Sequence, residues 1–210
     1  SGWCYSVSHA GGAMYVGIRG GVDLVTKYAQ SSRIKAVDGY VYSVSACDNL
    51  IYALVYVRIG SWTVRVYNSD YQLNRSWKHN DRLTLSNQLV VRKDSVLVPD
   101  RNSKNIIQYS LTGEVERHIP CRVLKSALTW LSVTSTLCNT VIVSCGDTVS
   151  SIDVGTGQCV WSTGSLERPT AVCCDDADRV YVAVGGKSNT INIAVLDGRT
   201  GSGVVPLSEL

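Results

Sequence analysis

Three short segments decide the fold of this chain: QYSLTGEV at residues 108–115, IDVGTGQC at 152–159 and VLDGRTGSG at 195–203. Each is an apolar run that leads into a Thr-Gly turn. The Thr-Gly pairs begin at residues 112, 156 and 200, a spacing of 44 residues each time. Two looser copies, TKYAQSSRIKAV and RVYNSDYQLNRSW, precede them. In this alignment Tyr28, Tyr67 and Tyr109 occupy the position that Asp153 and Asp197 hold in the later copies, and the three tyrosines are 39 and 42 residues apart. A period of roughly 40 to 45 residues is typical of a propeller blade.

Each copy contains four runs that are rich in β-branched residues and tyrosine and are separated by polar turns, and none keeps a helical period. In the first copy, the stretch GIRGGVD at 17–23 is interpreted as a loop and Asp38-Gly39 as a turn. The sequence therefore predicts an all-β fold, a β-propeller of about five four-stranded blades in a single domain over residues 1–210. The expected blades are residues 1–38, 39–80, 81–122, 123–166 and 167–210. Trp77 and Trp161 lie on fourth strands, where they are expected to fill gaps between adjacent blades.

The segments VYNSDYQLNRSW, SVLVPDRNSKNIIQYSLTGEVERHI and RVYVAVGGKSNTINIAVLDGRTG resemble the NHL-repeat propellers. The resemblance covers most of the chain and is strongest over residues 84–201. The chain departs from that family in its count, because NHL propellers usually have about six blades and this sequence offers about five. The fourth copy, SSIDVGTGQCVW, is also similar to a quinoprotein-type repeat. The NHL resemblance implies a non-catalytic binding or scaffold module whose partner is a protein segment or single-stranded RNA.

The net charge of +3 is too small to indicate nucleic acid by itself, but the charge is uneven along the chain. Residues 75–125 carry ten Lys and Arg against five Asp and Glu, so this stretch is +5 and the remainder is −2. In a propeller, alternate loops gather at the same rim, which predicts one basic rim and one acidic rim. Scattered solvated charges and Asp side chains that cap turns are the competing interpretation.

The predicted basic rim is the candidate binding surface. Its cations suit a phosphate backbone or an acidic protein segment, and one tryptophan and one histidine in its loops are expected to stack on bases. Its residues are Arg19, Arg58, Trp62, Lys78, His79, Arg82, Arg101, Lys104, Arg122, Lys125 and Lys187.

We expect no enzyme, no metal and no cofactor. The three histidines lie in unrelated settings, and no nucleophile elbow, phosphate-binding loop or dinucleotide fingerprint occurs. No apolar run reaches the roughly 20 residues that a membrane-spanning helix needs. The oligomeric state is not predicted.

The eight cysteines leave two possibilities open: buried thiols in apolar strands, or one or two disulfides. Buried thiols favour a cytoplasmic protein. The alternative is a secreted lectin-like or adhesion propeller, in which the sequon Asn74-Arg75-Ser76 is a glycan acceptor.

Overall fold

The computed structural model describes residues 4–10, 13–26, 31–58, 61–79, 88–100, 102–124, 131–135, 139–164, 166–185, 191–203 and 205–206. These residues form strands and turns without a helix, so none of them belongs to a helix long and apolar enough to cross a bilayer. The strands are β1 Cys4–Ala10, β2 Ala13–Val25, β3 Ser31–Cys47, β4 Leu50–Arg58, β5 Ser61–Tyr67, β6 Leu73–His79, β7 Val90–Val91, β8 Ser95–Asp100, β9 Asn105–Ser110, β10 Val115–Pro120, β11 Leu131–Ser135, β12 Thr140–Cys145, β13 Thr148–Asp153, β14 Cys159–Ser162, β15 Pro169–Cys174, β16 Arg179–Gly185, β17 Ile191–Asp197 and β18 Val205–Pro206.

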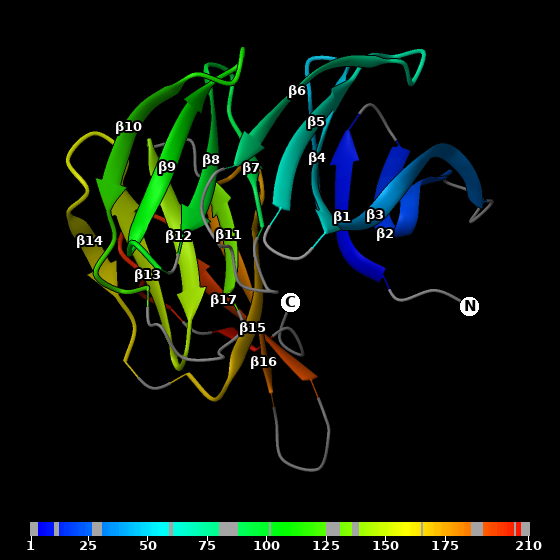
Figure 1. The fold of residues 1–210 in the computed structure, drawn as a ribbon. Helices are drawn as coiled ribbons and strands as arrows, with labels where there is room; N and C mark the ends of the chain where they lie inside the picture. Colours follow the sequence, from blue (N-terminus) through cyan, green and yellow to red (C-terminus); the bar gives the residue numbers. More distant parts are fainter. Residues whose placement is uncertain are drawn as a thin grey trace. The chain divides into compact units, whose positions relative to one another are not determined.

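The strands form four antiparallel sheets (Figure 1). The first has six strands in the order β1-β2-β3-β4-β5-β6. The others have four each, in the orders β10-β9-β8-β7, β11-β12-β13-β14 and β15-β16-β17-β18. The predicted all-β fold is confirmed. The predicted boundary between residues 38 and 39 falls inside β3, and β1 to β6 share one sheet, so the blade bounds stay a prediction.

Glycine explains why the chain continues where GIRGGVD was expected to form a loop. Residues 17–23 lie inside β2, where the register shifts between Arg19 and Gly21. Gly20 has a φ of +82°, and a Cβ on Gly21 would lie 2.1 Å from the carbonyl oxygen of Lys35. The glycines therefore form a β-bulge, which bends a strand without ending it.

The expected turn at Asp38-Gly39 is also wrong, for the same reason. Both residues lie inside β3, and Gly39 has a φ of +130°. A Cβ there would lie 2.3 Å from the carbonyl oxygen of Tyr56 on β4. The absent side chain lets β3 approach β4 closely, so an Asp-Gly pair that favours a turn locally is held in a strand by sheet pairing.

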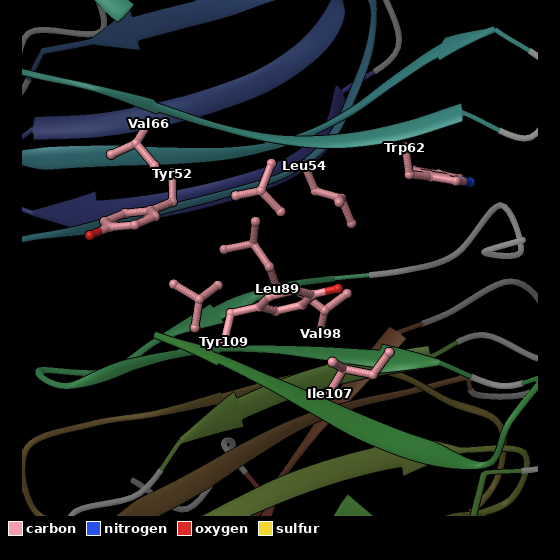
Figure 2. Close-up of a cluster of buried hydrophobic side chains, with 10 residues drawn as sticks. Tyr52, Leu54, Trp62, Val66, Leu89, Val98, Ile107 and Tyr109 are labelled. Atoms are coloured by element: carbon pink, nitrogen blue, oxygen red, sulfur yellow. The ribbon is translucent and has the colours of Figure 1, made fainter. Parts of the chain in front are cut away.

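The chain divides into two compact units, residues 1–102 with 107–117, and residues 103–106 with 118–210. The first unit contains two apolar clusters. One of them packs side chains of β4 and β5 against side chains of β8 and β9, and Figure 2 shows it with Trp62 at one end. The other packs Val22 and Tyr67 with valines of β3 and β4. The second unit has its own cluster, which includes Ile142, Val180 and Leu196.

A capped turn recurs at the outer strands of successive copies. In the two later copies, Oδ1 of Asp153 accepts hydrogen bonds from the N–H and hydroxyl of Thr156, and Asp197 does the same for Thr200. In the earlier copies, the same backbone position is held by Asn68 and Ser110. The cap is therefore one residue later than Tyr67 and Tyr109, which the sequence alignment matched to the two aspartates.

The turn glycine of each copy lies against the outer strand of the copy before it. A Cβ on Gly113 would lie 2.5 Å from the ring of Trp77, and one on Gly201 would lie 2.6 Å from the ring of Trp161. Trp161 also donates its indole N–H to the carbonyl of Gly198 at 2.9 Å. The two tryptophans fill the gaps between adjacent copies, as their positions on fourth strands predicted.

Candidate binding surface

One row of residues crosses the six-stranded sheet from solvent to the core. Its Cα partners are Arg19 with Tyr40, Tyr40 with Tyr56, Tyr56 with Trp62, and Trp62 with His79. Residues directly opposite each other on paired strands project from the same face of a sheet. The row therefore brings together three predicted site residues, Arg19, Trp62 and His79, that are far apart in the sequence.

Aromatic rings fill the middle of this row. We call Tyr5, Tyr40, Tyr42, Tyr56 and Trp62 the aromatic cluster. Its shortest ring-centroid distances are 4.9 Å between Tyr5 and Tyr42 and 5.0 Å between Tyr56 and Trp62. The four tyrosines are half-buried. Such rings in tilted and edge contact form a rigid surface that is apolar in the middle and carries hydroxyl groups.

The glycine bulges lie next to the residues that begin the row. Gly20 follows Arg19, and Gly39 precedes Tyr40. The register also shifts between Val41 and Ser43 on β3. Bulges bend a strand and redirect the adjacent side chain. The local sequence thus sets how Arg19 and Tyr40 are presented.

Arg19 is the exposed end of the row. Its guanidinium carbon lies 5.3 Å from the centroid of the Tyr40 ring, within the range of a cation–π contact. Arg19 makes no ion pair with any residue that the structure describes. Arg33, on the neighbouring strand, differs in this respect, because it pairs with Asp23 and donates to the carbonyl of Gly20.

The inner end of the row is buried, which corrects the expectation that Trp62 and His79 stack on bases. Trp62 is 1% exposed and His79 is 2% exposed. Trp62 lies in β5 and His79 ends β6, where its Nδ1 lies 2.5 Å from the hydroxyl of Tyr109. Trp62 points its indole nitrogen away from the rest of the core cluster (Figure 2), and this nitrogen has no hydrogen-bond partner among the described residues. Trp62 is the buried member of the aromatic cluster and contacts Tyr42 and Tyr56, whereas His79 contacts Tyr109.

Burial raises the pKa of the Tyr42 hydroxyl, and the neighbouring phenols of Tyr5, Tyr40 and Tyr56 raise it further. An ordinary tyrosine is already protonated at neutral pH. Tyr42 therefore stays neutral and able to donate a hydrogen bond over the whole physiological range.

The other predicted rim residues do not all join this row. Lys78 is exposed on β6, opposite Thr63. Lys104 and Arg122 are exposed in the second unit, where the N–H of Cys121 donates to the carbonyl of Lys104 at 2.8 Å. The prediction that these cations share one rim with Arg19 stays a prediction. Arg58 ends β4 and its side chain is not described, and four further rim residues lie outside the described residues: Arg82, Arg101, Lys125 and Lys187.

The aspartates of the predicted acidic rim include several that cap turns. Desolvation raises the pKa of Asp175, but hydrogen bonds from the backbone and side chain of Arg179 and from Tyr181 outweigh it, and the pKa falls to about 2. Hydrogen bonds from the backbone and hydroxyl of Thr200 lower the pKa of Asp197. These carboxylates have a structural role, which supports the competing interpretation of the sequence.

The described part of the chain contains no group of three or more His, Cys, Asp and Glu side chains that could hold a metal ion. Its seven cysteines are free thiols, and Cys138 lies outside the described residues. Cys121 and Cys145 are buried, as the apolar strand pattern predicted, whereas Cys4, Cys159 and Cys173 are exposed. Burial raises the pKa of Cys121 to about 12.

Sequence reasoning missed the four tyrosines of the cluster. Tyr40 and Tyr42 alternate within one strand, which is a usable signal for a shared face. Tyr5 and Tyr56 become their neighbours only through pairing across bulges, and a sequence alignment of repeats does not reveal that register.

Solved structures with similar folds cover nearly the whole chain. A protein of unknown function from Bacteroides caccae matches with a TM-score of 0.69 at 13% identity, over 98% of this chain and 82% of its own. The WD40 β-propeller domain of Doa1 matches with a TM-score of 0.64 at 15% identity, over 99% and 70%. A chain in a mitotic checkpoint complex matches with a TM-score of 0.66 at 13% identity, over 98% and 64%.

The chain thus spans between 64% and 82% of the length of these three structures. No family model matches the chain. No curated protein matches it either. Membership of the NHL-repeat family and the number of blades therefore stay predictions. The structural likeness, together with the antiparallel sheets described above, shows that the fold is of the β-propeller type.

Proposed function

We propose that this chain is a non-catalytic binding module of β-propeller type, and that a protein segment docks on the half-buried tyrosines of the aromatic cluster beside Arg19. The observation that carries the proposal is that the exposed arginine at the end of the row meets the four half-buried tyrosines of the aromatic cluster on one face of one sheet. Tyr, Trp and Arg dominate the binding energy of protein interfaces, because they bury large areas without losing many rotamers.

The buried side chains at the inner end of the row favour a preformed binding site. Trp62 and His79 are the buried members of the row, and Tyr56 lies between Trp62 and Tyr40. A surface whose rings are already fixed loses little conformational entropy when a partner binds.

The test is selection of a random dodecapeptide display library on the immobilised protein, followed by fluorescence anisotropy of the enriched peptides. We expect Tyr40→Ala to weaken binding by roughly tenfold or more, about 1.4 kcal/mol, which is the usual minimum for a central interface aromatic. Arg199→Ala, an exposed change in the other unit and outside every predicted site, is the matched control and keeps wild-type affinity. Thermal melting confirms that both variants fold. Equal binding by the two variants, or no enriched peptide, contradicts the proposal.

Single-stranded RNA is tested in the same assay with a labelled 12-nucleotide oligouridine. If the partner is a protein segment, the oligouridine binds more weakly than the selected peptides. Binding of the oligouridine that is tighter than peptide binding, and that falls steeply as salt rises, would replace the protein by RNA, because phosphate contacts release counterions.

We also propose a cytoplasmic location, which the free thiols support. A thiol titration of protein purified from its native source separates this location from secretion. Under denaturing conditions all eight cysteines react if the protein is cytoplasmic. In the folded protein, Cys4, Cys159 and Cys173 react first, because they are exposed, whereas Cys121 is protected by burial and its raised pKa. Fewer than eight thiols after denaturation would favour the secreted alternative.

A further inference from the structure

We infer that the docked segment is acidic, and that Arg19 selects it by binding an Asp or Glu carboxylate. This inference rests on the proposed function and names the partner chemistry of the same surface.

The Arg19 side chain is free to bind a carboxylate on a partner. It is exposed, its guanidinium lies over the Tyr40 ring, and it has no ion pair with the described residues. A guanidinium stacked on a ring keeps its in-plane N–H groups free, and these form the two parallel hydrogen bonds that fit a carboxylate. Stacking also fixes the side chain before the partner arrives, which lowers the entropy cost of binding.

The neighbouring cations, by contrast, are already engaged within the protein. Arg33 binds Asp23, and the Nζ of Lys35 lies 5.5 Å from the centroid of Tyr67, a residue of the other core cluster. The Asp23 carboxylate is therefore already paired with Arg33. Of these charged residues, Arg19 lies beside the aromatic cluster, and no described residue neutralises its charge.

The row also sets the length of the segment. Arg19 and Tyr56 are separated by two strand intervals, from β2 to β3 and from β3 to β4. Neighbouring strands lie about 4.8 Å apart, so the two positions are roughly 10 Å apart, the length of about three extended residues. The segment therefore carries its acidic residue two or three positions from an apolar residue that packs on Tyr40 and Tyr56.

The experiment repeats the dodecapeptide selection on the wild-type protein, on Arg19→Gln and on Arg199→Gln, followed by sequencing of each enriched pool. Arg199→Gln removes one exposed charge from a turn of the other unit, outside every predicted site, and is the matched control. We expect Asp and Glu to be enriched two or three positions from an apolar residue on the wild type and on Arg199→Gln, and this enrichment to vanish on Arg19→Gln.

Single peptides then give a double-mutant cycle. For a peptide from the wild-type pool, replacing its acidic residue by Asn or Gln weakens binding to the wild type roughly tenfold, but changes binding to Arg19→Gln less than about twofold. Arg19→Lys keeps the charge and loses the planar pair of donors, so its affinity lies between the two.

Two outcomes separate this inference from the proposed function. If the pools have equal acidic content on the wild type and on Arg19→Gln, while binding still requires Tyr40, the carboxylate assignment is wrong and the docking surface stands. If binding is independent of Tyr40, the docking surface is wrong, and the carboxylate assignment fails with it.

Discussion

The six-stranded first sheet and the two sheets of β11 to β18 follow different rules. In the later sheets, the Thr-Gly spacing of 44 residues is exact, each quartet is separate, and an aspartate caps the turn that precedes the fourth strand. In the first sheet, β3 runs through the boundary predicted between the first two copies, and β2 and β3 contain glycines at irregular register. The difference shows that a glycine bulge can keep the chain within a strand where the local sequence favours a turn.

The aromatic cluster lies in the irregular region. A regular repeat places the same residue type in every copy, whereas Tyr5, Tyr40, Tyr42 and Tyr56 meet once. Local departures from an otherwise consistent pattern are expected at functional sites. The comparison of the two regions therefore supports the same surface that the row of residues indicates. Three stability measurements test how the two regions differ.

The largest effect is expected for Gly39→Ala in the first sheet. The new Cβ would lie 2.3 Å from the carbonyl oxygen of Tyr56, at a φ of +130°. Because backbone must move to relieve this contact, we expect a loss of about 3 kcal/mol in urea-induced unfolding. Gly203→Ala is the matched control, with a φ of +86° and no atom within 4 Å of its Cβ. Its loss should be about 1 kcal/mol, because only the conformational strain applies. Equal losses would mean that the bulge does not depend on the close approach.

A smaller effect separates the two tryptophans that lie on turn glycines. Trp161 donates to the carbonyl of Gly198, whereas the indole nitrogen of Trp77 has no partner among the described residues. We expect Trp161→Phe to cost about 1 kcal/mol more than Trp77→Phe, because only the former removes a hydrogen bond. Urea titrations of both variants measure the difference. A larger cost for Trp77→Phe would contradict this account of how the two tryptophans pack on the turn glycines.

The smallest effect is the pH dependence of stability that a turn-capping carboxylate produces. It is expected at the Asp175 turn and not at the Asn68 turn. Asp175 caps its turn by accepting from the N–H groups of Ala177 and Arg179, and Asn68 caps the corresponding kind of turn in the first unit without a charge. The folded pKa of Asp175 is about 2, below the unfolded value of about 4. Its stabilisation is therefore complete above about pH 4 and is lost as the pH falls toward 2.

Asp175→Asn, which imitates Asn68, tests this sign. Its stability relative to the wild type, measured by chemical unfolding at pH 7, 4 and 2.5, should be lowest at pH 7 and approach the wild type at pH 2.5. The companion change Asn68→Asp should introduce the same loss of stability at low pH in the first unit. A gap between Asp175→Asn and the wild type that stays constant over this range would show that the carboxylate contributes no charge-dependent stability.

Much of the second unit could be predicted because its signals are local. Asp153 and Asp197 cap turns within three residues, and Trp161 lies at the same step of its copy as Trp77 does of its own. The incorrect predictions concern segments in which pairing between strands overrides a local preference for a turn. The glycines of GIRGGVD and Asp38-Gly39 favour turns in isolation, but partners on β3 and β4 hold them in strands.

The candidate site was predicted in part. Arg19 is exposed, as a rim cation is expected to be, whereas Trp62 and His79 were expected in loops and lie buried in strands. Their burial depends on β8 and β9, which pack against β4 and β5 in the first core cluster. The residues that flank Trp62 in the sequence do not indicate that packing.

The sequence alone determined that this protein is an all-β repeat chain, because a spacing of 44 residues and the turn chemistry of Asp, Thr and Gly act over a few residues and need no distant partner. Only the tertiary structure decided where the copies merge and which side chains meet. The row of Arg19, Tyr40, Tyr56 and Trp62 depends on strand register, and register is set by contacts between residues that are distant in the chain.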